Sequence, residues 1–155
     1  MATNGNFKRK HYLAPYTGGD TPPTGDTAWQ RFGNRIATMT DDSNEETDSS
    51  VFYDSLDGTA EETLLSRTEI WTFEGQYDPA DKAHQIVAKA RRSDDEGRKV
   101  WHKIEETDGS TVIGVAKIFE PKAGGGDASA KETISGRIAY VRTPEVTAPP
   151  SGGGE

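Results

Sequence analysis

Large and polar side chains alternate most clearly along residues 64–77. Successive side chains of a β-strand point to opposite faces, so Trp71 and Phe73 share one face while Ile70 and Thr72 share the other. Aromatic and β-branched residues of this kind are enriched in strands. The alternation therefore predicts a strand over this segment.

An earlier segment, residues 28–40, carries apolar groups on both faces of the same alternation. Trp29 and Met39 fall on one face, and Phe32 and Ile36 fall on the other. A strand that is covered on both sides shows this pattern, either inside a sandwich or at an interface. We expect residues 28–40 to form one such strand.

Two more strands are predicted as a hairpin, and a last one follows them. Residues 98–106 and 111–120 alternate around an Asp-Gly pair at 108–109, which is a strong turn signal. Pro121 is expected to end the second strand, because proline cannot donate to a strand ladder. Residues 132–142 alternate again and predict the closing strand.

One helix is expected, over residues 79–92. Asp78 can cap its first turn, and Pro79 fits the first helical position. The apolar residues recur every three or four positions and form one narrow stripe: Ala80, Ala83, Ile86, Val87 and Ala90.

A long acidic loop is predicted at residues 41–62. Residues 36–66 contain no basic residue, and an aromatic island lies near the centre of the loop. Loops of this length inside a compact domain are uncommon and are usually functional or mobile. We expect the loop to become ordered on contact with another chain. Its contact candidates are Val51, Phe52, Tyr53 and Leu56, and the acids that define it include Asp41, Asp42, Glu45, Glu46 and Asp48.

Both ends of the chain are expected to be arms around a domain at residues 28–143. Residues 1–27 and 144–155 are rich in proline and glycine and have little apolar content. Either these arms are unfolded tails, or the first one docks on a neighbouring subunit. The residues that would dock are Tyr12, Leu13 and Tyr16.

These elements predict the fold class. The protein is expected to be mainly β, as a β-sandwich or partly open barrel with one flanking α-helix, a long acidic loop and extended N- and C-terminal arms. A length of 155 residues allows one domain, and only 32% of the residues are apolar. Such a composition favours additional burial against a partner.

The charge and residue content exclude several classes of function. A net charge of −8 repels phosphate backbones, which argues against stable nucleic-acid binding. The chain has no cysteine, which excludes a disulfide scaffold and thiolate chemistry. No apolar run approaches the length of a membrane helix, which argues against a membrane-spanning segment.

No catalytic or metal-binding arrangement is recognisable. His11, His84 and His102 lack the spacing of zinc ligands, and His84 is expected to be a packing residue of the helix. The acids at 41–45 and 54–58 lack the ligand pattern of a calcium loop. We therefore expect no enzyme activity, no catalytic residue and no cofactor.

The order of elements resembles that of the tail tube (major tail) proteins of long-tailed, non-contractile bacteriophages. The resemblance is carried by residues 68–91, 99–121 and 132–146, and it covers roughly residues 28–146. It implies that six copies close into a ring and that rings stack into a hollow tube through which genomic DNA passes without specific binding. The expected partners are further copies of the chain, a tape-measure protein, and tail terminator and tail tip proteins.

The same resemblance implies a location in the virion tail after assembly in the bacterial host cytoplasm. The arms and the acidic loop would then bridge neighbouring subunits or rings, and the loop acids are candidates for the lumen. An alternative is a monomeric β-sandwich binding module, for virion decoration or carbohydrate binding. That module would expose an aromatic platform, for which the candidates are Trp29, Trp71 and Trp101.

Overall fold

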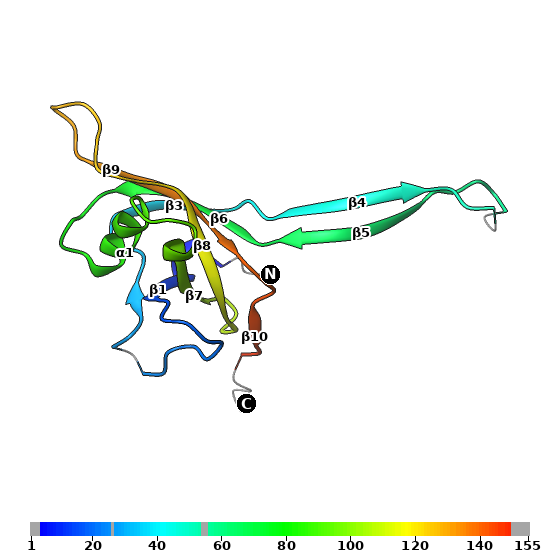
Figure 1. The fold of residues 1–155 in the computed structure, drawn as a ribbon, viewed down its shortest axis with the longest axis horizontal. Coiled ribbons are helices and arrows are strands. Elements are labelled where there is room, and N and C mark those ends of the chain that lie inside the picture. The colour runs from blue at the N-terminus through cyan, green and yellow to red at the C-terminus, as the bar shows by residue number, and fades with distance from the viewer. Residues whose placement is uncertain (1–3, 26, 54–55, 150–155) are drawn as a thin grey trace.

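The described residues form one curled sheet, one α-helix and one long hairpin (Figure 1). The computed structural model describes residues 4–25, 27–53 and 56–149. The sheet has the strand order β2-β1-β7-β8-β9-β6-β3, and β10 pairs with β8. This architecture confirms the predicted fold class, a mainly β, partly open barrel with one flanking helix.

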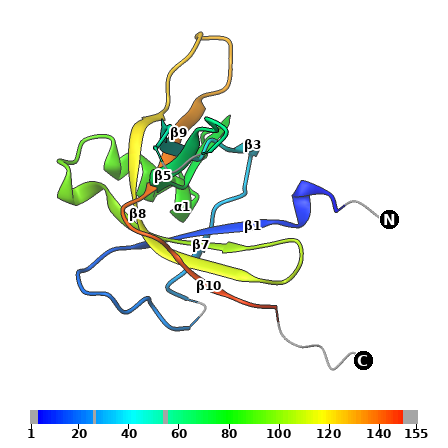
Figure 2. The ribbon, with the colours of Figure 1, turned by 90° about the vertical axis from the view of Figure 1, so that its right-hand side faces the viewer.

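The strands of the main sheet are antiparallel throughout. Figure 2 shows β1, β7, β8 and β10 lying side by side. The bounds are β1 Lys10–Pro15, β2 Gln30–Arg31, β3 Ile36–Asp41, β6 Ile70–Gln76, β7 Lys99–Glu105, β8 Thr111–Ala123, β9 Thr133–Tyr140 and β10 Glu145–Thr147. Short 3-10 turns span Asn6–Lys8 and Glu96–Arg98.

The core lies between the sheet and the helix α1, Lys82–Ala90. Phe32 and Phe73 meet edge to face at 4.8 Å between ring centroids, an arrangement that aromatic pairs favour. Val87 of α1 and Ile138 of β9 are fully buried in the same cluster. A smaller cluster on the other face of the sheet contains Ala14, Trp29, Trp101 and Val115.

The predicted strand 28–40 is wrong in one respect, because it is broken into β2 and β3. Arg35 adopts a positive φ of 62°, which a strand interior does not allow. The turn before β3 is closed by a hydrogen bond from the Ile36 N–H to the Gly33 carbonyl. Of the apolar groups that predicted a doubly covered strand, Trp29 and Phe32 flank β2, and Ile36 and Met39 lie on β3, at the opposite end of the sheet.

Pro121 does not end its strand as predicted, because β8 bulges there and continues to Ala123. The register steps from Phe119 opposite Arg137 to Lys122 opposite Ser135, so β8 holds one extra residue. A bulge tolerates proline because the bulged residue is left out of the ladder. Gly136 lies opposite and closely approaches Pro121, where a larger side chain would not fit.

The helix begins three residues later than predicted, at Lys82 instead of Pro79. Asp81, rather than Asp78, is the N-cap, and its carboxylate accepts from the backbone N–H groups of Ala83 and His84. His84 is fully buried, as a packing residue should be. Its Nδ1 accepts from the Asp78 N–H at 3.0 Å, and its Nε2 donates to the Asn34 carbonyl at 2.8 Å. His84 therefore ties α1 to the turn between β2 and β3.

Part of each predicted arm belongs to the main sheet. The strand β1 pairs with both β2 and β7, and β10 extends the sheet beside β8. Sequence patterning missed β1 because the strand is short and lies between proline- and glycine-rich residues. Residues 150–155 of the predicted C-terminal tail lie outside the described residues.

Two buried histidines connect β1 to β7. His11 Nδ1 lies 3.1 Å from His102 Nε2, and the two rings are stacked. The ring of Trp71 meets His11 edge-on, and that of Tyr140 stacks on His102. Burial, together with the charge of nearby Arg9, lowers the pKa of His11 to about 4. Burial also holds the pKa of His102 well below its usual range.

We predict that acid destabilises the fold below pH 6.5. Both histidines stay neutral in the folded state, whereas each takes up a proton in the unfolded chain as the pH falls through 6.5. The free energy of unfolding should fall by about 2 kcal/mol per histidine between pH 6.5 and 5. Urea unfolding across this range tests this, with His11→Phe expected to lose part of the dependence. A flat profile would contradict it.

Val87→Asp should unfold the protein, because it places an unpaired carboxylate in the fully buried core. We expect a loss of at least about 3 kcal/mol in the free energy of unfolding. Gln85→Asp, on the exposed side of α1, is the matched control and should lose less than about 1 kcal/mol. Equal losses in the two variants would refute the packing of this helix face.

Candidate assembly surfaces

The predicted acidic loop is largely a two-stranded hairpin. The strands β4, Asn44–Ser50, and β5, Glu61–Thr68, pair from Asn44 opposite Thr68 to Ser50 opposite Glu61. They project from the body and form a separate sheet (Figure 1). The loop prediction was wrong here because polar side chains occupy both faces of these strands, so the sequence has no period-two hydrophobic signal.

Large exposed apolar side chains gather on this hairpin. Of the nine in the described part of the chain, six lie between β4 and the end of β5: Val51, Phe52, Tyr53, Leu56, Leu64 and Leu65. The first four are the predicted contact candidates. Leu64 and Leu65 were missed because their segment was assigned to the strand that became β6. An isolated hairpin is marginal in water, and this one has no core of its own.

The predicted loop acids divide between the hairpin and its base. Glu45, Glu46 and Asp48 lie on β4, exposed to solvent. Asp41 ends β3, and its carboxylate accepts from the backbone N–H of Ser43. Asp42 accepts from the hydroxyl of Thr72 on β6 at 2.5 Å, which places it beside the main sheet.

A polar sheet face lies on the side of β3, β6, β9 and β8 that is away from the core. It surrounds a shallow depression of about 330 Å³. Its polar side chains are four short hydroxyls and two charges of each sign: Thr38, Thr40, Thr72, Glu74, Glu120, Lys122, Ser135 and Arg137. Arg137 is held over the Phe119 ring and pairs with Glu120 at 3.2 Å. This face was not predicted, and the alternating Thr and Ser of these strands is the signal that could have found it.

Residues of the N-terminal segment that were predicted to dock on a neighbour have partners within their own chain. Leu13 is completely buried, so it belongs to the core of its own subunit. The hydroxyl of Tyr12 donates to Glu105, and the ring of Tyr16 lies against Trp101. Both tyrosines remain half-buried at the surface.

The three tryptophans do not form the exposed platform that a carbohydrate-binding module needs. Trp29, Trp71 and Trp101 are all less than 10% exposed. Trp29 and Trp101 pack with Val115 on one face of the sheet, and Trp71 lies in the main core. The burial of these side chains removes the exposed aromatic platform on which the alternative function, a β-sandwich binding module, depended.

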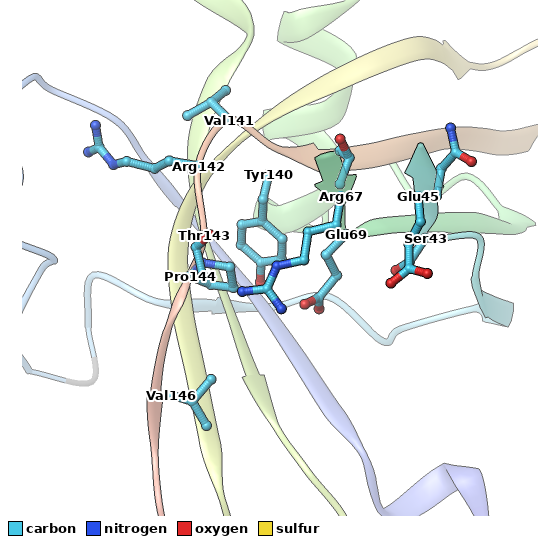
Figure 3. Close-up of a pocket in the computed structure, with 12 residues that line it drawn as sticks. Ser43, Glu45, Arg67, Glu69, Tyr140, Val141, Arg142, Thr143, Pro144 and Val146 are labelled. Atoms are coloured by element: carbon cyan, nitrogen blue, oxygen red, sulfur yellow. The ribbon is translucent and has the colours of Figure 1, made fainter. Parts of the chain in front are cut away.

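A pocket of about 420 Å³ lies at the base of the hairpin (Figure 3). Arg67 faces it from β5 and Glu69 from the link between β5 and β6, and Arg142 and Pro144 border it from the chain after β9. Tyr140 lines the same pocket, and burial together with the nearby Glu69 and Glu106 raises the pKa of its hydroxyl. The lining holds charges of both signs and several hydroxyl groups but no histidine or cysteine, so it shows no recognisable catalytic pairing.

No metal-binding cluster occurs in the part of the chain that the structure describes. It contains no group of three or more His, Cys, Asp or Glu residues that could hold a metal ion. Across the same residues, no helix is both long and apolar enough to cross a membrane. The distinctive surfaces are the hairpin, the polar sheet face and the strand edges beside them.

Comparison with known proteins gives structural neighbours but no sequence relatives. No family model and no curated protein matches the chain. A chain from the tail of an empty gene transfer agent particle, determined with helical refinement and C6 symmetry, aligns at a TM-score of 0.65 and 19% identity. The alignment covers 95% of this chain and 100% of that one. This chain has the fold of a tail protein.

A second neighbour supports the same assignment of the fold. A chain from the virion of a native gene transfer agent particle aligns at a TM-score of 0.67 and 16% identity, again over 95% of this chain and all of its own length. Both neighbours come from phage-like particles. The tail-protein fold extends over the hairpin and the body together, because so little of the chain is left unaligned.

The body should fold without the hairpin. Replacing residues 46–66 with Asn-Gly joins the paired residues Glu45 and Arg67 by a two-residue turn. Because the removed side chains are almost all exposed, the free energy of unfolding should change by less than about 1 kcal/mol. Chemical denaturation of the two proteins checks this, and a loss above about 3 kcal/mol would show that the hairpin stabilises the body.

Proposed function

We propose that this chain is a structural tail tube subunit, which self-assembles into stacked hexameric rings that form the hollow tube of a phage-like tail. Genomic DNA passes through the tube during ejection. The observation that carries the proposal is a fold shared over 95% of the chain with a chain from a tail of C6 symmetry, combined with a hairpin that forms a separate two-stranded sheet beyond the body.

Two features of the chain support self-assembly. The strand β3 is an outermost strand of the main sheet, and among the described residues it pairs with β6 alone, so its other edge is available to a neighbouring copy. Open strand edges tend to pair with other chains, and closed symmetric assembly removes them. The hairpin supplies the second feature. It extends beyond the body by roughly 24 Å along β4, far enough to contact another subunit.

The polar sheet face is the proposed wall of the lumen. It presents Glu74 and Glu120 against Lys122 and Arg137, with short hydroxyls between them. Such a wall is hydrated and nearly neutral, so it offers a passing polyanion no strong binding site. The acids Glu45, Glu46 and Asp48 lie on the hairpin instead, where they take part in contacts between subunits or rings.

The remaining roles follow from the proposed tube. Its partners are further copies of the chain, a tape-measure protein within the tube during assembly, and tail terminator and tail tip proteins at its ends. The subunit is assembled in the bacterial host cytoplasm and is located in the tail of the virion. No enzymatic step and no cofactor is part of this function.

Electron microscopy of the concentrated protein tests the proposal. We expect rings with a central hole and tubes built from them, whereas the variant with Asn-Gly in place of residues 46–66 should form no long tubes. Uniform small particles at every concentration of the intact chain would contradict the proposed function. Long tubes from the shortened variant would contradict the role of the hairpin in joining rings.

A further inference from the structure

A surface groove, distinct from the pocket at the hairpin base and the depression on the polar sheet face, lies at the free edge of β3. It has a volume of about 500 Å³ and is bordered by the N-terminal segment on one side and β3 on the other. Five consecutive residues of β3, from Ile36 to Thr40, line it. Since successive side chains of a strand point to opposite faces, a run of five indicates that the strand borders the groove with its edge. This is the edge that β6 does not occupy.

The groove is basic and partly apolar. Its lining contains Arg9 and Arg31 and no acidic residue. Arg9 is paired with Glu106 at 2.6 Å, whereas Arg31 is exposed and forms no ion pair with any described residue. Phe7 lies on the rim and is 82% exposed, and Ile36 and Met39 are half-buried within the groove.

The hairpin has the complementary properties. Residues 44–68 carry seven acidic residues and one basic residue, so they hold six of the eight net negative charges of the chain. Phe52 and Leu56 are exposed near the tip, and the hairpin is extended. It projects away from the body, so its tip lies far from β3 of its own chain (Figure 1).

We propose that the groove between β3 and the N-terminal segment receives the acidic tip of the hairpin from a second copy of this chain. The apolar tip residues pack against Phe7, Ile36 and Met39, the acids of the tip face Arg31, and one hairpin strand runs along the free edge of β3. Strand addition of this kind supplies affinity through backbone hydrogen bonds and specificity through side-chain pockets. The inference rests on the proposed self-assembly and identifies its receiving surface.

Engineered disulfides test the contact directly, because the chain has no cysteine of its own. In the double variant Met39→Cys/Phe52→Cys, oxidation under assembly conditions should give a ladder of linked subunits on a non-reducing gel. The two positions cannot link within one chain, because β4 carries Phe52 roughly 24 Å from the body and a disulfide needs Cα atoms within about 7 Å. The single variant Phe52→Cys controls for links between two tips and should give dimers at most.

A second double cysteine variant distinguishes this groove from the pocket at the hairpin base. Val146→Cys/Phe52→Cys places the second cysteine on the rim of that pocket. If the double variant at Val146 and Phe52 forms linked subunits and the one at Met39 and Phe52 does not, the inference is overturned and the base pocket is the receiving surface. Tubes that form without any link through Met39 overturn the inference alone, whereas the absence of rings and tubes for the unmodified chain would overturn the proposed function.

A charge exchange gives an independent readout of the same contact. Arg31→Glu should raise the concentration needed for assembly at least tenfold, and adding Glu61→Arg and Glu62→Arg should restore much of the loss. Lys131→Glu makes the same change of charge on the exposed turn between β8 and β9 and should have little effect. An equal effect of the Arg31 and Lys131 variants, or no rescue, would contradict the proposed contact.

Discussion

The hairpin formed by β4 and β5 depends on burial that its own chain does not supply. Within the described part of the chain its two strands pair with each other alone, and its large apolar side chains are exposed. Two-stranded hairpins need a packed face to be stable in water. The main sheet has the same kind of deficiency at β3, whose outer edge has no partner strand. The proposed contact with identical copies would complete both the hairpin and this edge.

The body provides a rigid base for these surfaces. The sheet curls around a core that α1 covers, and the buried pair His11 and His102 connects β1 to β7 beneath Trp71 and Tyr140. Trp71 lies at the start of β6, directly after the hairpin, so this packing fixes the point from which the hairpin leaves the body. A well-packed base of this kind allows an exposed hairpin to keep a defined direction.

The sequence predicted the elements that bury one face or that are buried on every side. The strand carrying Trp71 and Phe73, the helix carrying Val87 and the mainly β class all follow from periodic burial. The hairpin was missed because both faces of Glu45 and its neighbours are solvated, which leaves no alternation to read. The place of Leu13 in the core and the grouping of Thr38, Thr72 and Ser135 on one face depend on strand order, which pairs residues far apart in the chain.

Hydrogen exchange of the hairpin amides, compared between the free chain and its assembled form, tests the central claim most directly. If the hairpin is completed only by neighbouring copies, amides of residues 44–68 should exchange rapidly in the free chain and become protected in the assembly, while amides of β7, β8 and β9 stay protected in both. Equal and strong protection of the hairpin in a chain that never self-associates would contradict the account.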